Sequence, residues 1–118
     1  MSEKVALFVF AGPEIPCRLM HALVFALDLQ ARGGEAKIVL EGEAPGWLLA
    51  LPNPKHKMHG MYGKAKAAGL IDAVCRACAV QAGAVEAAEE EGLRLANDAM
   101  GHVSLAPYLE AGFTIATL

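Results

Sequence analysis

Residues Val5 to Phe10 form a continuous apolar run, Val-Ala-Leu-Phe-Val-Phe, near the start of this 118-residue chain. A strand with one face in water alternates apolar and polar residues, whereas a run without alternation fits a strand buried on both faces. Strands of that kind belong to parallel sheets that helices cover on both sides. The run therefore favours an α/β fold.

A helix and a second strand follow this first strand. Pro16 suits the first turn of a helix, and Gly33-Gly34 suits its end. Between them, apolar residues recur at helical spacing, which predicts the buried face of the helix: Met20, Leu23, Val24, Leu27 and Ala31. Residues Ala36 to Leu40 form the next strand-like run. A strand, a helix and a strand with short connections predict a right-handed crossover between parallel strands.

The rest of the chain continues the alternation of helices and strands. We expect short helices over 44–51, 58–68, 77–82, 85–91 and 104–111, and strands over 71–74, 93–95 and 113–118. The length fits one domain with one core. The sequence therefore predicts a single α/β domain over 1–118, with a mostly parallel sheet of about five strands and flanking helices.

Composition excludes several classes of partner. The formal net charge is −3 and no basic block is present, so we expect no nucleic-acid partner. The apolar runs are too short to cross a bilayer and no signal peptide is recognisable, which predicts a cytoplasmic protein without a membrane partner. Hydrophobic residues make up 55% of the chain, and this favours self-association.

Two of the three cysteines lie in the run Cys75-Arg76-Ala77-Cys78, where a strand is predicted to end and a helix to begin. The free N–H groups of a first helical turn stabilise negative charge, so we expect a lowered pKa for Cys75. Cys78 lies one helical turn later, at the spacing of a C-x-x-C redox pair. It also fits as a core residue of an alanine-rich helix.

The carboxyl ends of the parallel strands are expected to meet at one edge of the sheet, where ligands bind in such folds. Gly12 and Pro13 follow the first strand, Gly42 follows the second and Cys75 the third. We therefore predict that Gly12 and Pro13 contribute to substrate binding beside Cys75.

Cys17 and Arg76 are further candidates for substrate binding. Cys17 falls on the apolar face of the first helix, which favours core packing, yet that helix starts at the same edge of the sheet and Cys17 could approach Cys75. Arg76 either is a solvated surface charge or lowers the pKa of Cys75 and holds an anionic sulfur species.

The sequence predicts neither a metal site nor a cofactor. Cys17 and His21 have helical spacing, and together with Cys75 and Cys78 they would provide four zinc ligands. No second C-x-x-C and no His-x-x-x-His pair supports that arrangement, and the remaining histidines are scattered. The chain also lacks a P-loop, a G-x-G-x-x-G and a G-x-S-x-G motif, which argues against nucleotide binding and serine hydrolysis.

The segment Cys75 to Gly83, Cys-Arg-Ala-Cys-Ala-Val-Gln-Ala-Gly, resembles the cysteine motif of the DsrE/DsrF/TusD-like family of small sulfur-relay proteins. The similarity extends nearly end to end, through the first strand and Gly12-Pro13, the helix over 17–33, the second strand with Glu41-Gly42, and the final helix, glycine and strand.

The resemblance implies that Cys75 is the sulfur-accepting cysteine, which carries a persulfide between donor and acceptor proteins. It also implies a flavodoxin-like or Rossmann-like fold and a homo-oligomer, a trimer or a hexamer. Cys78 departs from the family pattern, because carrier subunits have a small apolar residue there. A second thiol at this position could resolve the persulfide or close a disulfide.

The predicted function is therefore sulfur relay, with a persulfide on Cys75 that Cys78 could resolve; any enzymatic activity would be that of a sulfurtransferase. Two alternatives remain open at this point. One is a C-x-x-C thiol oxidoreductase, which would form a reversible disulfide between Cys75 and Cys78. The other is a non-catalytic oligomeric protein that binds a small ligand or a metal.

Overall fold

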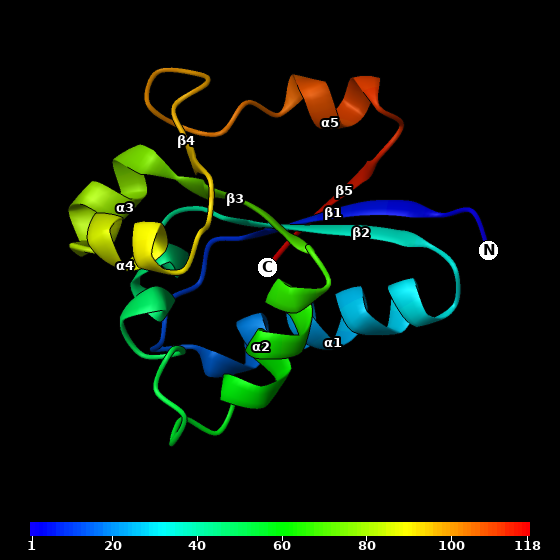
Figure 1. Cartoon of the computed structure of the whole chain (residues 1–118). Coiled ribbons are helices and arrows are strands. Elements are labelled where there is room, and N and C mark those ends of the chain that lie inside the picture. Colours follow the sequence, from blue (N-terminus) through cyan, green and yellow to red (C-terminus); the bar gives the residue numbers. More distant parts are fainter.

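Five parallel strands form the central sheet of the computed structural model, which describes residues 1–118 (Figure 1). Their order across the sheet is β4-β3-β2-β1-β5, and every neighbouring pair is parallel. The strands are β1 Lys4–Val9, β2 Glu35–Leu40, β3 Ile71–Cys75, β4 Leu95–Ala96 and β5 Thr114–Thr117. This sheet confirms the predicted α/β class and its resemblance to Rossmann-like folds.

Helices cover both faces of the sheet. They are α1 Pro16–Ala31, the 3₁₀ helix η1 Ala44–Leu49, α2 His59–Ala67, α3 Arg76–Ala82, α4 Val85–Glu90 and α5 Ala106–Glu110. Figure 1 shows α1 and α2 on one side of the sheet and α5 on the other, with α3 and α4 beyond the end of β3. The helices and strands therefore alternate along the chain as the sequence predicts.

The apolar run of β1 is buried on both faces, as expected. Leu7 and Val9 pack into the larger core with α1, η1 and α2. Ala6 and Phe8 point the other way, into a smaller core that also contains Tyr108 of α5. Because alternate residues enter different cores, a polar side chain at any position from Ala6 to Val9 would be a buried polar group.

The buried face of α1 differs from the prediction. The fully buried residues of this helix are Leu19, Ala22, Leu23 and Ala26, so the face is rotated relative to the expected stripe. Met20, Val24 and Phe25 are exposed by 37%, 42% and 50%. The two small alanines let the helix approach the large side chains of the sheet closely, and the bulkier residues are left on the outside.

The fourth strand is also displaced from its predicted position at 93–95. The Leu93 amide still donates a hydrogen bond to the Ala88 carbonyl at the end of α4, so Leu93 belongs to the turn that closes this helix. The chain reaches β3 only at Arg94, whose carbonyl accepts from the Val74 amide. Strand β4 therefore begins at Leu95 and pairs only with the last residues of β3.

Candidate functional site

Cys75 lies at the end of β3 and is the N-cap residue of α3. Its thiol is fully buried and points into the smaller core, on the face of the sheet that α5 covers. The Sγ atom accepts a hydrogen bond from the Cys78 amide at 3.4 Å. The strand therefore fixes the position of this thiol, and the first turn of α3 supplies an N–H group to it.

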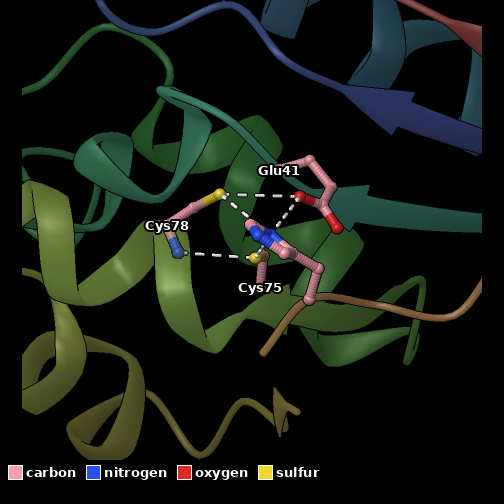
Figure 2. Close-up of side chains that lie close together, drawn as sticks. Glu41, Cys75 and Cys78 are labelled. Carbon is pink, nitrogen blue, oxygen red and sulfur yellow. Dashed lines mark hydrogen bonds and ion pairs between the residues drawn. The ribbon is translucent and has the colours of Figure 1, made fainter. Parts of the chain in front are cut away.

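Cys78 lies one turn further along α3, and its side chain is half-buried. Its thiol donates a hydrogen bond to Oε1 of Glu41 at 3.5 Å, and Figure 2 shows Cys75, Cys78 and Glu41 turned toward one another. The structure thus brings together the two cysteines that the sequence singled out, beside a carboxylate that it did not.

Glu41 follows β2 directly and is the one buried charged residue of the chain, with 7% exposure. Strand β2 lies next to β3, so the residue after β2 reaches the residue that ends β3. The Val103 amide donates to Oε2 of Glu41 at 3.1 Å, which leaves Oε1 facing the thiols. The backbone therefore orients this carboxylate from the opposite side.

His102 enters the site from the loop between β4 and α5. Its Nδ1 atom lies 3.0 Å from Sγ of Cys75, 3.7 Å from Sγ of Cys78 and 3.7 Å from Oε1 of Glu41. The ring is half-exposed, with 49% of its side-chain surface accessible to solvent. His102 is thus the part of the site that connects the buried thiol to water.

Gly101 allows the loop to come this close to α3. Its carbonyl accepts a hydrogen bond from the Ala77 amide at 3.0 Å, and its φ of +89° is a conformation that side chains rarely adopt. A Cβ atom at this position would lie 3.3 Å from the Cβ of Ala77. Glycine therefore satisfies both the backbone conformation and the contact that hold His102 over Cys75.

The pKa of Cys75 is raised rather than lowered, which overturns the expectation from the strand–helix junction. Burial is the largest cause, and together with the Cys78 thiol and the Glu41 carboxylate it raises the pKa of Cys75 to about 12. The hydrogen bond from the Cys78 amide acts in the opposite direction but is outweighed. A helix N-terminus cannot compensate for full desolvation beside a carboxylate.

The predicted substrate-binding pair Gly12 and Pro13 lies at the same edge of the sheet but outside the thiol cluster. Gly12 is buried against Glu43, where an added Cβ would come within 3.0 Å of the Glu43 backbone and side chain. It lines a hollow with Phe10 and Arg18, between the ends of β1 and β5. The two residues therefore lie at the expected edge of the sheet, and their part in substrate binding stays a prediction.

Cys17 and Arg76 are both exposed. Cys17 does not pack in the core as expected, because α1 is rotated; its Sγ lies 3.3 Å from Nδ1 of His21. The four side chains that could share a metal ion include neither Cys17 nor His21. No hydrogen bond or ion pair joins Arg76 to Cys75, so its position fits a solvated surface charge.

Glu41 and His102 are the site residues that sequence reasoning missed. A signal existed for Glu41, because a carboxylate directly after one strand of a parallel sheet lies beside the residue that ends the next strand. His102 gave no such signal, since its loop is irregular and contains no periodic pattern. Only the folded path of residues 97–103 brings this histidine back over α3.

Comparisons with known proteins give relatives without an assigned function. No model of a known protein family matches the chain. A solved structure, the conserved protein of unknown function BT1422 from Bacteroides thetaiotaomicron, has a TM-score of 0.63 with 15% identity, covering 98% of this chain and 95% of that one. At this identity the likeness shows the fold alone.

Sequence similarity is closer to two uncharacterized proteins. One, from Archaeoglobus fulgidus, is 41% identical over 44 residues, which cover 37% of this chain and 69% of that protein. The other, MJ0733 from Methanocaldococcus jannaschii, is 38% identical over 120 residues, which cover 98% of this chain and 95% of that protein. The chain therefore belongs to the same protein family as MJ0733.

Proposed function

We propose that this protein is a small sulfur carrier that holds sulfur as a persulfide on Cys75, with Cys78 as its working partner. The observation that carries the proposal is the position of His102 Nδ1, 3.0 Å from the Cys75 sulfur and 3.7 Å from the Cys78 sulfur. A nucleophile beside a base is the arrangement that activates a thiol. The resemblance of the cysteine motif to the DsrE/DsrF/TusD-like family supports the same function.

Exposure suggests the order in which the thiols react. Cys75 has no exposed surface, whereas Cys78 is half-buried and lies nearer to solvent. In the first step the Cys78 thiolate attacks the outer sulfur of a donor persulfide, the S–S bond of the donor breaks, and the donor leaves as a thiolate. Cys78 then carries the sulfur as a persulfide.

The second step moves the sulfur inward. The Cys75 proton passes to Nδ1 of His102, and the Cys75 thiolate attacks the outer sulfur of the Cys78 persulfide. The S–S bond at Cys78 breaks, and its thiolate takes the proton back from His102. The persulfide now lies on the buried thiol, where the surrounding protein shields it from small thiols in solution.

Release depends on which sulfur atom is attacked. For transfer to an acceptor, the Cys78 thiolate attacks the outer sulfur of the Cys75 persulfide and takes it back, and the Cys75 thiolate leaves. The acceptor protein's thiolate then attacks the outer sulfur on the half-buried Cys78, and the Cys78 thiolate leaves. If the Cys78 thiolate attacks the inner sulfur instead, hydrogen sulfide ion leaves and a disulfide joins Cys75 to Cys78. Donor and acceptor proteins are therefore the partners of the proposed function.

The proposal is tested by loading the protein with labelled sulfur from a cysteine desulfurase and labelled cysteine, followed by a brief wash with a small thiol. We expect wild-type protein to retain the label, and both Cys75→Ser and Cys78→Ser to lose it. Cys17→Ser is the matched control, because Cys17 is exposed and lies outside the cluster. Equal retention by Cys75→Ser and wild type would refute storage on Cys75.

A thiol oxidoreductase is the second candidate, and one observation favours it. Ligand atoms of Cys75 and Cys78 lie within 4.8 Å of each other, and the Cys78 amide already contacts the Cys75 sulfur. A small movement would form a disulfide. This function predicts a reversible disulfide with a measurable midpoint potential and no retained label, so the two experiments together separate it from sulfur carriage.

A further inference from the structure

Four side chains of the site present a mixed set of metal ligands: two sulfurs, one imidazole nitrogen and one carboxylate oxygen. One such atom from each of Glu41, Cys75, Cys78 and His102 lies within 4.8 Å of all the others. Cysteine sulfur and histidine nitrogen are the donors that Zn²⁺ prefers, and a carboxylate is a common additional ligand. We infer that these four residues form a binding site for one divalent transition-metal ion, with Zn²⁺ the best match.

The spacing of the donor atoms agrees with tetrahedral coordination. Zinc bonds of about 2.3 Å to sulfur and about 2.0 Å to nitrogen or oxygen require ligands separated by about 3.3–3.8 Å. Three of the six separations are 3.5 Å from Cys78 Sγ to Glu41 Oε1, 3.7 Å from Cys78 Sγ to His102 Nδ1 and 3.7 Å from that nitrogen to the Glu41 oxygen. The separations of Cys75 from Cys78 and from Glu41 are within 4.8 Å. The 3.0 Å between Cys75 Sγ and His102 Nδ1 needs only a small outward shift.

The charge of the site points to a cation as well. Glu41 is buried, yet no lysine or arginine contacts it, and its one ion-pair neighbour is His102. Buried carboxylates in proteins are paired with a positive charge or coordinate a metal. By contrast, the partly buried carboxylate of Glu91 has the Lys66 ammonium group at 3.0 Å. A divalent ion would supply the charge that Glu41 lacks.

The backbone holds the ligands before any ion arrives. Glu41 directly follows β2, and Cys75 is the last residue of the neighbouring strand β3. Cys78 lies in the first turn of α3. The Val103 amide binds Oε2 of Glu41 and leaves Oε1 free for a metal. Such supporting hydrogen bonds orient metal ligands and raise affinity. The half-exposed His102 then provides the route by which an ion enters.

Metal binding is a property separate from sulfur carriage, although both use the thiols of Cys75 and Cys78. A thiolate that coordinates zinc has a lone pair in the metal bond and is hindered from attacking a persulfide. Bound metal would therefore block sulfur loading, and removal of the metal would restore it. The metal site does not depend on the proposed function, because an ion can bind here whether or not the protein ever carries sulfur.

The test is titration of the chelator-treated full-length protein with Co²⁺ alone, and competition of Zn²⁺ against a chromophoric chelator. Tetrahedral Co²⁺ with two sulfur ligands gives intense visible bands and a sulfur-to-metal charge-transfer band in the near ultraviolet. We expect these bands to saturate at one ion per chain and to disappear when Zn²⁺ is added. Saturable binding without the charge-transfer band would overturn the ligand assignment, and absence of binding would overturn the site.

Variants identify the ligands. Glu41→Gln keeps both thiols and is expected to weaken Zn²⁺ binding by at least about tenfold. Loss of a hydrogen bond that supports a ligand already lowers metal affinity by about that factor, and loss of the ligand itself should lower it at least as much. Cys78→Ser alters a half-exposed position, so it tests the site even if a change at buried Cys75 unfolds the chain. Cys17→Ser should bind as wild type does. Equal affinity of Glu41→Gln and wild type would refute the carboxylate as a ligand.

Sulfur loading of the same samples separates the two proposals. If Glu41→Gln no longer binds Zn²⁺ yet retains labelled sulfur, both proposals hold. If wild type binds Zn²⁺ stoichiometrically and the metal-free wild type never retains sulfur, the metal site stands and the carrier function fails. If wild type retains sulfur and neither Co²⁺ nor Zn²⁺ binds, the carrier stands and the metal site fails.

Discussion

At the scale of single residues, the surroundings of Cys75 decide its chemistry. The residue caps α3, a position that favours a thiolate, yet burial and the neighbouring carboxylate raise its pKa to about 12. The proton must therefore be removed by a specific neighbour when the thiol reacts. His102 is the neighbour placed for that role, with Nδ1 3.0 Å from the sulfur.

The replacement His102→Gln tests this role. We expect the initial rate of sulfur transfer from the desulfurase to Cys75 to fall by about 100-fold, the lower end of what a general base contributes. The matched control is His21→Gln, since His21 also contacts a thiol, that of Cys17, but lies outside the cluster. Unchanged transfer in His102→Gln, with the melting temperature of wild type, would exclude the histidine as the base.

Gly101 provides a second test at this scale. Alanine at this position must adopt a positive φ and contact Ala77, so we expect Gly101→Ala to lower the free energy of unfolding by about 1–2 kcal/mol and to slow sulfur loading. Gly69 has a positive φ of 72° and nothing within 4 Å of an added Cβ, so Gly69→Ala carries the backbone cost alone. Urea unfolding that shows an equal or larger loss in Gly69→Ala would contradict the proposed contact.

At the scale of elements, side-chain pairs fasten the short helices to the sheet. The hydroxyl of Tyr108 on α5 donates to Asp72 on β3 at 2.5 Å, and Lys37 on β2 also binds this carboxylate. Helix α5 is only five residues long, so it depends on such contacts for its position. The hydrogen bond joins α5 to the strand that carries Cys75.

The hydrogen bond between Tyr108 and Asp72 makes the free energy of unfolding depend on pH. Burial acts to raise the pKa of Asp72, but hydrogen bonds from Tyr108 and Lys37 outweigh it, so the pKa of Asp72 is lowered on folding. The unfolded chain then binds protons more readily, and the stabilisation is complete above the unfolded pKa of about 3.9 and is lost as the pH falls through the folded value.

We expect the free energy of unfolding in urea to fall less between about pH 7 and about pH 3 in Asp72→Asn than in wild type. Tyr108→Phe keeps the carboxylate but removes its donor, so it should lower stability at neutral pH by about 1–2 kcal/mol and reduce the acid loss in part. An acid loss in Asp72→Asn as large as that of wild type would show that this carboxylate does not cause it.

The elements also show what the sequence can predict. Continuous apolar runs located β1, β2 and β3 within a residue or two, because strands buried on both faces leave a clear pattern. The buried face of α1 was predicted wrongly, since spacing alone does not tell that Ala22 and Ala26 pack more closely on a sheet than larger residues do. Strand β4 has two residues, too few for any pattern.

At the scale of the whole molecule, α1 leaves apolar side chains on the surface. Met20, Val24 and Phe25 are all more than one-third exposed. Exposed apolar groups of this kind are common at contacts between subunits. The predicted homo-oligomer remains a prediction, and this face of α1 is where we expect it to form. The structure contains no helix that could span a membrane; even α1, with 16 residues, is too short.

The replacement Phe25→Glu tests the proposed assembly, because a charge in an apolar contact is unfavourable. We expect sedimentation velocity to show an oligomer for wild type and a smaller species for Phe25→Glu. Val80→Glu is the control, since Val80 is 60% exposed on α3, away from α1. A wild-type monomer, or an unchanged assembly in Phe25→Glu, would contradict this contact.

The four residues of the thiol site come together only in the folded chain. They are separated by up to 61 positions, from Glu41 to His102, and come from the residue after β2, from β3, from α3 and from a loop. The sequence could place Cys75 and Cys78 together because they share one helical turn. It could not place His102, because that depends on the path of an irregular loop and on Gly101.

Localisation of the transferred sulfur decides whether the buried Cys75 thiol stores it. Trypsin cleaves after Arg76 and so separates Cys75 from Cys78 onto different peptides. After incubation with a cysteine desulfurase and cysteine, a small-thiol wash and alkylation, we expect one added sulfur atom on the Cys75 peptide and none on the Cys78 or Cys17 peptides. Sulfur found only on the Cys78 peptide, or on no cysteine, would contradict the proposal that the buried Cys75 thiol stores it.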